Sequence, residues 1–294
     1  MNGEFAMKIL VLGADGQIGS EFREQAHNWP EIQFNFCSKG DVDILDFNQI
    51  KTHVDRFQPN FLINCSAYTA VDKAESEEEK CMQINVSGVE NLVKALAGTD
   101  TVLVHFSSDY VYHVPGPWPI LETSEIHPLG VYARSKAQGD LAILQSGIKA
   151  MIWRISWVVS PFRHNFIKTM VKLTSERPQL NVVDDQFGAI TYTYDLVHAL
   201  MKALIHTKSD ATRDYSGIYN YANEGLTTWY DLAYRITKHR DIPCKIIPIP
   251  TEAYPTPAAR PHWSVLDKDK VKRTFDILIP HWYDALKRCL DRLE

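Results

Sequence analysis

Two residues with complementary acid–base chemistry, Tyr132 and Lys136, stand four positions apart in the segment VYARSKAQGD. On a helix this spacing places both side chains on one face. A tyrosine hydroxyl has a pKa near 10 and is a poor proton donor or acceptor at neutral pH, but a neighbouring ammonium stabilises the phenolate and lowers that pKa. The pair therefore predicts proton transfer to or from a substrate. Surface helices carry many such pairs by chance, so the prediction needs support from elsewhere in the chain.

A hydroxyl group at the end of the preceding apolar run provides that support. The run TVLVHF (101–106) is followed by Ser107, Ser108 and Asp109, about 24 residues before Tyr132. A strand-end hydroxyl can hydrogen-bond a substrate carbonyl and polarise it for hydride attack. The alternative is a serine that caps a helix or turn. With Tyr132 and Lys136 following in the expected order, the sequence predicts an active dehydrogenase or reductase.

Three glycines follow the first apolar run, KILVL (8–12): Gly13, Gly16 and Gly19. A dinucleotide site needs this context, in which a strand leads through a tight turn into a helix whose amides face a pyrophosphate. The spacing GxxGxxG is typical of extended short-chain dehydrogenases, whereas simple Rossmann dehydrogenases have GxGxxG. The alternative is an ordinary glycine turn.

The elements that must position these residues alternate through the first half of the chain. Such alternation predicts an α/β fold, a right-handed, doubly wound parallel Rossmann sheet. The strands are expected at 8–12, 32–37, 61–67, 101–108 and 149–156, and the helices from about Ser20 into the mid-20s and at 48–57, 77–97 and 128–145.

The second half is rich in proline and less regular, which indicates a smaller C-terminal substrate-binding region. Its elements are expected at 166–174, 194–205, 218–222, 229–238 and 282–293. We interpret residues 1–6 as an N-terminal extension, 7–156 as the dinucleotide-binding domain and 157–294 as mainly the substrate-binding region. Residues 192–222 of that region are expected to return to the Rossmann domain.

Composition narrows the choice of partners. The formal net charge is −5 and no lysine- or arginine-rich block occurs, so nucleic acid is not an expected partner. No apolar stretch reaches the roughly 20 residues that span a bilayer, so no membrane partner is expected. The five cysteines are scattered and the eleven histidines are dispersed. This indicates reduced thiols, a cytoplasmic location and no metal site.

The end of the second expected strand bears on the choice of cofactor. An NAD-specific Rossmann protein usually places an acid there to bind the ribose 2′-hydroxyl. Here Ser38 and Lys39 follow Cys37, and the first acid is Asp41. A hydroxyl and a cation suit a 2′-phosphate, so NADPH is favoured, with NADH as the alternative. Lys39 as a solvated loop residue is nearly as consistent.

Beyond these elements, longer stretches make the chain similar to a known family. From Met7 nearly to the C-terminus it resembles the dTDP-4-dehydrorhamnose reductases, extended short-chain dehydrogenases that make dTDP-L-rhamnose. Gln17, directly after the middle glycine, is part of this family's signature. The stretches that carry the resemblance are LGADGQIG (12–19), INCSAYTAVDKAESE (63–77), FSSDYVY (106–112), VYARSKAQGD (131–140), WRISWVVSPFRHNF (153–166), DDQFGAITY (184–192) and YPTPAARPHWSVLD (254–267).

The resemblance implies a role for each matching residue. Tyr132 is the proton donor to the C4 oxygen, Lys136 its electrostatic partner and nicotinamide-ribose ligand, and Ser108 the carbonyl-polarising hydroxyl. Asp109 and Trp157 contact substrate, and Arg260 is a candidate partner of the diphosphate. The remaining residues are implied to bind the cofactor: Gly16, Gln17 and Ile18 at the pyrophosphate, Asp46 and Phe47 near the adenine, and Ala67, Tyr68 and Thr69 along its length.

Several of these residues have plain structural alternatives, and the chain departs from the family at a few positions. Asp46 and Phe47 could cap and pack a helix start, Trp157 could belong to the core, and Arg260 could form a surface ion pair. Val159, Ser160, Ile190 and Ala133 stand where relatives carry Tyr-Gly, Pro and Gly. Positions 159 and 190 fall near the expected sugar-nucleotide pocket, so the exact hexose stays open.

The expected reaction is NAD(P)H-dependent reduction of the C4 ketone of dTDP-4-dehydro-6-deoxy-L-mannose to dTDP-L-rhamnose. The alternatives are a reductase or epimerase for another nucleotide-linked keto-sugar, a 4,6-dehydratase, and a non-catalytic NADP-binding regulatory subunit. A dehydratase needs a second acid next to Asp109, where Tyr110 stands instead. A regulatory subunit has no need of an intact Ser108, Tyr132 and Lys136. A homodimer is open, since relatives form dimers.

Overall fold

The computed structural model describes residues 7–210 and 212–293 of the 294-residue chain. The expected N-terminal extension, residues 1–6, lies outside the described residues. Among the helices described, none has both the length and the apolar character that crossing a membrane requires.

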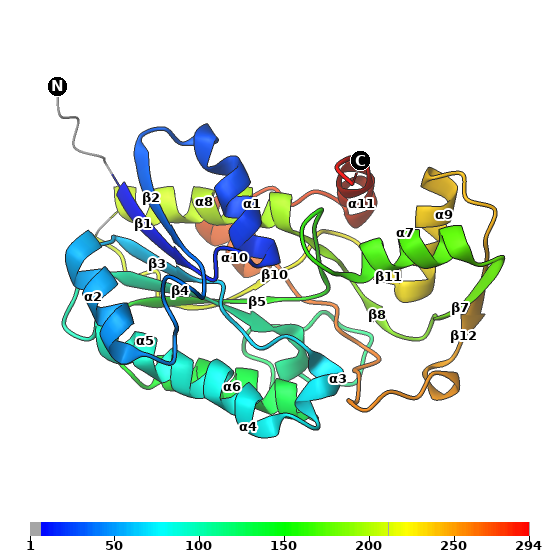
Figure 1. Cartoon of the computed structure of the whole chain (residues 1–294), viewed down its shortest axis with the longest axis horizontal. Helices are drawn as coiled ribbons and strands as arrows, with labels where there is room; N and C mark the ends of the chain where they lie inside the picture. The colour runs from blue at the N-terminus through cyan, green and yellow to red at the C-terminus, as the bar shows by residue number, and fades with distance from the viewer. Residues whose placement is uncertain (1–6, 211, 294) are drawn as a thin grey trace.

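The predicted parallel sheet is confirmed. Six strands pair in parallel in the order β10-β5-β4-β3-β1-β2 (Figure 1). Strands covered on both faces read as continuous apolar runs rather than as alternating patterns, and this is why KILVL and TVLVHF stand out in the sequence. The strands are β1 (Met7–Leu12), β2 (Ile32–Cys37), β3 (Phe61–Asn64), β4 (Val102–Ser108), β5 (Ala150–Ile155) and β10 (Gly217–Tyr221).

Helices cover both faces of this sheet (Figure 1). One core, which includes Phe22, Leu196 and Val271, packs beneath α1 (Gln17–Gln25), α8 (Thr193–Ser209) and α10 (Asp269–Phe275). The other, which includes Ile50 and Val89, packs beneath α2 (Phe47–Phe57), α5 (Gly88–Leu96) and α6 (Val131–Leu144). Short helices connect the layers: η1 (Ala26–Asn28), α3 (Val71–Ala74), α4 (Glu78–Met82), η2 (Gln83–Ser87) and η3 (Asp109–Val111).

The long helix expected at 77–97 is continuous in the chain but changes its winding. Between α4 and α5, η2 is a π-helical turn, the kind of irregularity that is common at functional sites. Within it the Asn85 side chain holds the Tyr68 backbone, accepting from its N–H at 2.9 Å and donating to its carbonyl at 3.1 Å. A Cβ at Gly139 would lie 2.5 Å from the Asn85 carbonyl, so only glycine allows α6 to approach η2 this closely.

The remaining chain forms a second lobe beside the sheet, at the right of Figure 1. Its core includes Ile167, Leu232 and Trp282. The strands here are short and form three two-stranded pairs, β6 with β9, β7 with β12 and β8 with β11. Its elements are β6 (Val158–Val159), α7 (Phe166–Glu176), β7 (Gln179–Val183), β8 (Phe187–Gly188), β9 (Thr191–Tyr192), β11 (Thr227–Thr228), α9 (Trp229–His239), β12 (Lys245–Ile249), η4 (Thr251–Ala253) and α11 (Trp282–Asp291).

Two helix starts differ from the predictions. Helix α1 begins at Gln17, directly after its N-cap Gly16, and not near Ser20. Helix α6 begins at Val131 rather than near Pro128, because the Glu75 carboxylate accepts a hydrogen bond from the Val131 N–H. Helix α10 and the strands β7 and β12 were not expected, since they are short and bordered by proline or charged residues.

Candidate active site

The glycine loop lies where the strand order of the sheet reverses, because β1 pairs with β2 on one side and with β3 on the other. Open α/β sheets bind ligands beyond the carboxyl ends of their strands at this point. Gly13 has a φ of +70°, and a Cβ there would lie 2.7 Å from the Ser66 nitrogen. A Cβ at Gly19 would lie 2.5 Å from the Gly13 carbonyl oxygen. Both glycines are therefore required by close backbone approach.

A cavity of about 530 Å³ opens at this edge of the sheet. It brings together ten of the residues predicted for the site, from the first helix turn to the start of the second lobe: Gly16, Gln17, Ile18, Ala67, Thr69, Ser108, Asp109, Tyr132, Lys136 and Trp157. Gly13 and Gly19 shape the loop beneath it. Ser38, Lys39, Asp46, Phe47, Tyr68 and Arg260 are not among the residues that line it.

Ser108 ends β4 and faces two reactive neighbours. Its Oγ donates to the Asp109 carboxylate at 3.0 Å. The same oxygen accepts from the Tyr110 N–H, which is the capping role considered as an alternative. Burial raises the pKa of Tyr132, and the neighbouring Ser108 side chain lowers it. Burial raises the pKa of Asp109 to about 7, against hydrogen bonds that lower it. A buried group of hydroxyl and carboxyl side chains thus lies at the strand end.

Lys136 is buried and lies one helical turn after Tyr132 on α6. Its Nζ donates to the Phe106 carbonyl at 2.7 Å and lies 3.1 Å from Nε2 of His105. Burial lowers the pKa of Lys136 to about 8. Burial raises the pKa of Tyr132. In this structure the Lys136 side chain contacts β4 through the Phe106 carbonyl.

A pair of stacked indoles forms the wall of the cavity on the side of the second lobe. Trp157 and Trp229 lie with ring centroids 3.8 Å apart, and both line the cavity. Trp157 has a φ of +44°, which is rare for a bulky residue. Trp229 Nε1 donates to the Gln186 side chain at 3.1 Å. Trp229 was missed in the sequence, where the only signal was an aromatic residue at the start of a helix.

The residues predicted near the adenosine form local contacts instead of lining the cavity. The Ser38 N–H and hydroxyl both donate to Asp41, at 2.8 and 2.7 Å. Lys39 is exposed, with 81% of its side chain accessible. Asp46 caps α2 by accepting from the Asn48 and Gln49 amides, which is the structural alternative considered for it, and Phe47 begins that helix half-exposed.

Arg260 and Tyr68 also have protein partners. The Arg260 guanidinium contacts both carboxylate oxygens of Asp72, at 3.0 and 2.8 Å, as well as the Ala258 carbonyl. The Tyr68 hydroxyl donates to Glu77 at 3.1 Å. The AVDKAE stretch thus contributes Asp72 to hold the C-terminal loop and Glu75 to begin α6, and neither function was visible in the sequence.

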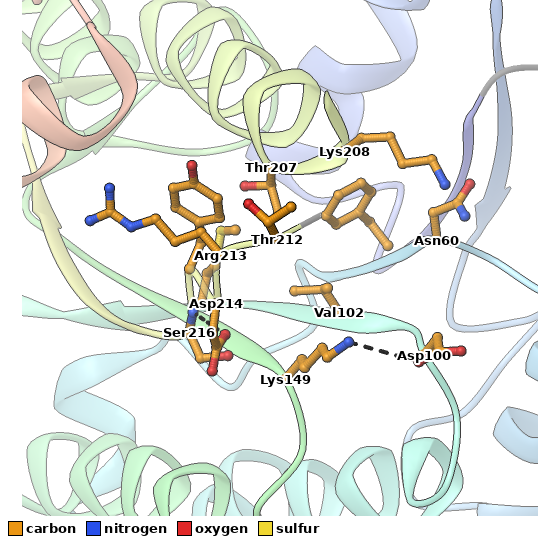
Figure 2. Close-up of a pocket in the computed structure, with 13 residues that line it drawn as sticks. Asn60, Asp100, Val102, Lys149, Thr207, Lys208, Thr212, Arg213, Asp214 and Ser216 are labelled. Atoms are coloured by element: carbon orange, nitrogen blue, oxygen red, sulfur yellow. Dashed lines mark hydrogen bonds and ion pairs between the residues drawn. The ribbon is translucent and has the colours of Figure 1, made fainter. Parts of the chain in front are cut away.

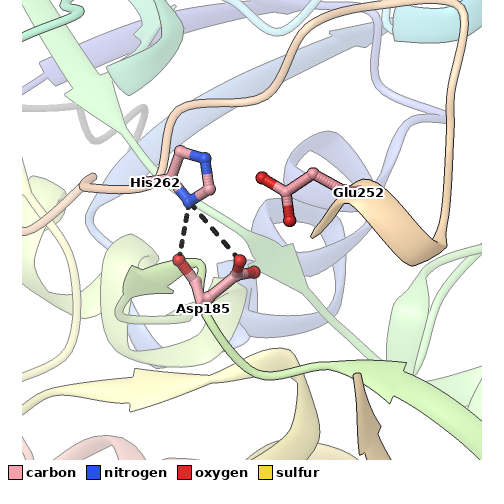
Figure 3. Close-up of side chains that lie close together, drawn as sticks. All are labelled: Asp185, Glu252 and His262. Atoms are coloured by element: carbon pink, nitrogen blue, oxygen red, sulfur yellow. Dashed lines mark hydrogen bonds and ion pairs between the residues drawn. The ribbon is translucent and has the colours of Figure 1, made fainter. Parts of the chain in front are cut away.

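Three potential metal ligands come together elsewhere in the described part of the chain. Asp185, Glu252 and His262 offer atoms within 4.8 Å of one another (Figure 3). Glu252 and His262 are exposed, and the Asp185 carboxylate already accepts from the Thr251 N–H and hydroxyl. These contacts tie the end of β7 to η4, and we assign the group this structural role.

A second cavity, of about 490 Å³, lies at the opposite edge of the sheet (Figure 2). It is bordered by residues before β4 and β5, such as Asp100 and Lys149, by the end of α8, including Lys208, and by the segment that follows that helix. None of the residues predicted from the sequence lines it. Lys149 pairs with Asp100 there at 3.7 Å, whereas the predicted catalytic residues line the first cavity.

A parallel sheet with a glycine loop at its switch point, a strand-end serine and a helix with the YxxxK pair define the class of extended short-chain dehydrogenases/reductases. Within this class, the chain belongs to the family described as the RmlD substrate binding domain, whose model matches residues 7–294.

Similar proteins cover nearly the whole chain. It is 38% identical to a dTDP-4-dehydrorhamnose reductase of Escherichia coli (strain K12), over 98% of each chain. It is 34% identical to one of Sinorhizobium fredii (strain NBRC 101917 / NGR234), over 96% of each. Among solved structures, the dTDP-4-dehydrorhamnose reductase of Bacillus anthracis str. Ames, in complex with NADP, has a TM-score of 0.90 and 30% identity, covering 97% of this chain and 99% of that one.

Proposed function

We propose that the protein catalyses NADPH-dependent reduction of the C4 ketone of dTDP-4-dehydro-6-deoxy-L-mannose to dTDP-L-rhamnose. The observation that carries the proposal is the convergence of Ser108, Tyr132 and Lys136 on one cavity, next to a glycine loop at the switch point. The relatives that are 30–38% identical over nearly the full length carry this activity in their names.

The residues around the loop fit a dinucleotide. Gly13 and Gly19 leave no room for a Cβ, and helix α1 begins at the cavity with an uncapped Gly16. Its first amides have no partner within the helix and suit a pyrophosphate. We propose that Gly16, Gln17 and Ile18 hold the pyrophosphate. Ala67 and Thr69 would lie along the cofactor, while Ser38 and Lys39 would reach its 2′-phosphate and Asp46, Phe47 and Tyr68 would support the adenosine side.

When bound, the cofactor supplies the hydride that reduces C4. The side chains of the protein then have to polarise and protonate the oxygen bound to that carbon. Ser108 would donate a hydrogen bond to the ketone oxygen and polarise it, and Tyr132 would give that oxygen a proton as charge develops. Lys136 would bind the nicotinamide ribose and, as an ammonium, stabilise the phenolate. Asp109 and Trp157 would orient the sugar, and binding of the distant nucleotide would fix the geometry.

Absorbance at 340 nm tests this function with purified protein, NADPH or NADH, and dTDP-4-dehydro-β-L-rhamnose made in situ from dTDP-glucose. We expect rapid oxidation of NADPH, and Tyr132→Phe to abolish it while still binding NADPH. Oxidation of NADPH with another nucleotide-linked keto-sugar, but not with this one, would show that the other sugar is the substrate of the enzyme. Binding of NADPH without turnover of any of them would favour a regulatory subunit.

Two further expectations belong to this proposal. Arg260 is proposed to support the diphosphate region through the loop that it shares with Asp72. We also place the reaction in the cytoplasm, in keeping with five cysteines that carry no disulfide, and cell fractionation tests that. A homodimer stays a prediction, for which light scattering of the purified protein gives the mass.

A further inference from the structure

A buried polar chain runs from β3 to the catalytic helix through two residues that the proposed reaction does not use. Asn64 ends β3 and His105 lies in β4, and each is about 1% exposed. Asn64 Nδ2 lies 3.1 Å from Nδ1 of His105, and Nε2 of His105 lies 3.1 Å from Nζ of Lys136. The imidazole therefore bridges an amide and an amine inside the protein, where every donor needs an acceptor.

The positions of the protons in this series of hydrogen bonds follow from Asn64, at which the series begins. The Ser66 N–H donates to Oδ1 of Asn64 at 3.0 Å, so the amide must present its NH₂ group to His105. Nδ1 of His105 is then the acceptor, and the ring proton resides on Nε2, facing Lys136. An N–H at this position can be satisfied only by a lone pair on Nζ, which an ammonium lacks and a neutral amine has. Lys136 still donates one of its own protons to the Phe106 carbonyl.

We propose that Asn64 and His105 form a positioning pair for the catalytic lysine: Asn64 selects the Nε2–H tautomer of His105, and His105 holds Lys136 and favours its neutral amine. The pair is not a proton wire, because the chain ends at a backbone amide and an asparagine side chain. Its effect is on where Lys136 points and on its balance between amine and ammonium.

Some of the groups around Lys136 lower its pKa and others raise it. A hydrogen bond to the neutral form of a group disfavours its charged form, and burial does the same. Burial lowers the pKa of Lys136 to about 8, whereas Asp140 and Cys81 raise it. The pKa of His105 is lowered well below its usual value by burial and by Lys136, which keeps the imidazole neutral. The other ionisable groups close to this part of α6 are Tyr132, Asp109, Tyr110 and Arg154.

The catalytic consequence rests on the proposed function. If the ammonium of Lys136 stabilises the phenolate left after Tyr132 gives up its proton, turnover falls as the pH rises through the pKa of Lys136. Favouring the amine brings that pKa into the working range of the enzyme.

The first test needs no substrate. Nitrogen-15 NMR of the wild-type protein, labelled in histidine and lysine, reports the tautomer of His105 and the ionisation of Lys136. We expect the proton of His105 on Nε2, and Lys136 to titrate more than two pH units below the usual value of about 10.4. A proton on Nδ1, or an ammonium that persists above pH 10, would overturn the proposal.

The second test uses Asn64→Asp to reverse the direction of the hydrogen bonds between residue 64, His105 and Lys136. The carboxylate keeps an acceptor for the Ser66 N–H but replaces the amide donor with a second acceptor. We expect the ring proton of His105 to move to Nδ1, Nε2 to accept from the Lys136 ammonium, and the pKa of Lys136 to rise by about one unit or more. The alkaline limb of the kcat/KM profile should move to higher pH by the same amount.

Two control variants show whether the change in tautomer comes merely from an added negative charge or from the loss of any histidine ring. Asn35→Asp adds the same charge in β2, and His206→Gln removes another histidine, one bonded to Tyr215. Neither should change the His105 tautomer. An unchanged tautomer in Asn64→Asp would contradict the proposal, and if that variant does not fold, the wild-type spectrum decides. An intact tautomer and lysine titration without reductase activity would instead reject the proposed function and leave this pair standing.

Discussion

The Ser160 hydroxyl donates a hydrogen bond of 2.8 Å to Oε1 of Gln17, across 143 positions of sequence. Asn165 Nδ2 donates to the same oxygen at 3.0 Å, and the Arg163 side chain donates to the Asp15 carbonyl at 2.5 Å. The segment 160–165 therefore packs on the glycine loop, and the signature glutamine joins the two lobes at the proposed pyrophosphate site.

Ser160→Ala is predicted to weaken NADPH binding by about fivefold, because the hydrogen bond to Gln17 that it removes is worth roughly 1 kcal/mol. The substitution also removes the contacts of this hydroxyl with the Phe162 backbone. Ser160 is fully buried and does not line the cavity, so the loss acts through Gln17. Fluorescence titration gives the dissociation constant. Gln83→Ala, which removes a surface glutamine paired with Glu79, serves as a control and should bind normally. Equal affinity in Ser160→Ala would show that the contact between the lobes does not order the loop.

Gly188→Ala is predicted to impair use of the sugar nucleotide while sparing the cofactor. An added Cβ would lie 2.8 Å from the Trp157 ring, which is already stacked on Trp229, so the indole has to shift in the cavity. We expect the KM for the keto-sugar to rise about tenfold or more, as overpacking displaces a binding wall. Initial rates at saturating NADPH measure this effect. A matching rise in the dissociation constant of NADPH would mean that the substitution disturbs the whole cleft.

Lys39→Glu is predicted to weaken the preference for the phosphorylated cofactor. The exposed ammonium lies 4.0 Å from Asp43, a long contact that leaves it available to a 2′-phosphate. Replacing it with a carboxylate adds repulsion, so the ratio of kcat/KM for NADPH to that for NADH should fall about tenfold or more. Lys51→Glu, which changes a lysine paired with Asp55 on α2, controls for net charge. An unchanged ratio would show that Lys39 is a solvated loop residue.

The substitution Asp109→Asn is predicted to raise the free energy of unfolding, relative to that of the wild type, by more at high pH than at low pH. Because burial raises the pKa of Asp109 to about 7, the folded protein binds a proton more tightly than the unfolded chain. This contribution is complete below the unfolded pKa near 4 and is lost as the pH increases to 7. Asparagine cannot ionise, so the stability of the variant relative to wild type should be greater at pH 8 than at pH 5, by about 2.5 kcal/mol.

Urea unfolding at these two pH values provides the measurement for Asp109→Asn. Contributions from all other groups cancel in the difference between the two proteins. The same difference in free energy at pH 5 and pH 8 would mean that Asp109 ionises normally in the folded protein.

The sequence by itself determined the parallel sheet, the glycine loop and the order of Ser108, Tyr132 and Lys136. These features are written in local patterns, because buried parallel strands are continuous apolar runs and helical spacing brings Tyr132 and Lys136 onto one face. The same local logic predicted that Asp46 could be a helix cap, and the structure shows it capping α2.

Only the tertiary structure decided which residues meet across the cleft. Trp229 stacks on Trp157, Arg260 pairs with Asp72, and His105 contacts Lys136, although no periodicity relates these positions. Such contacts depend on how the second lobe folds over the carboxyl ends of the strands. They also depend on which buried polar groups find hydrogen-bond or ion-pair partners once water is excluded. Burial also decided the ionisation of the site, because desolvation outweighs the charge effects that spacing alone would suggest.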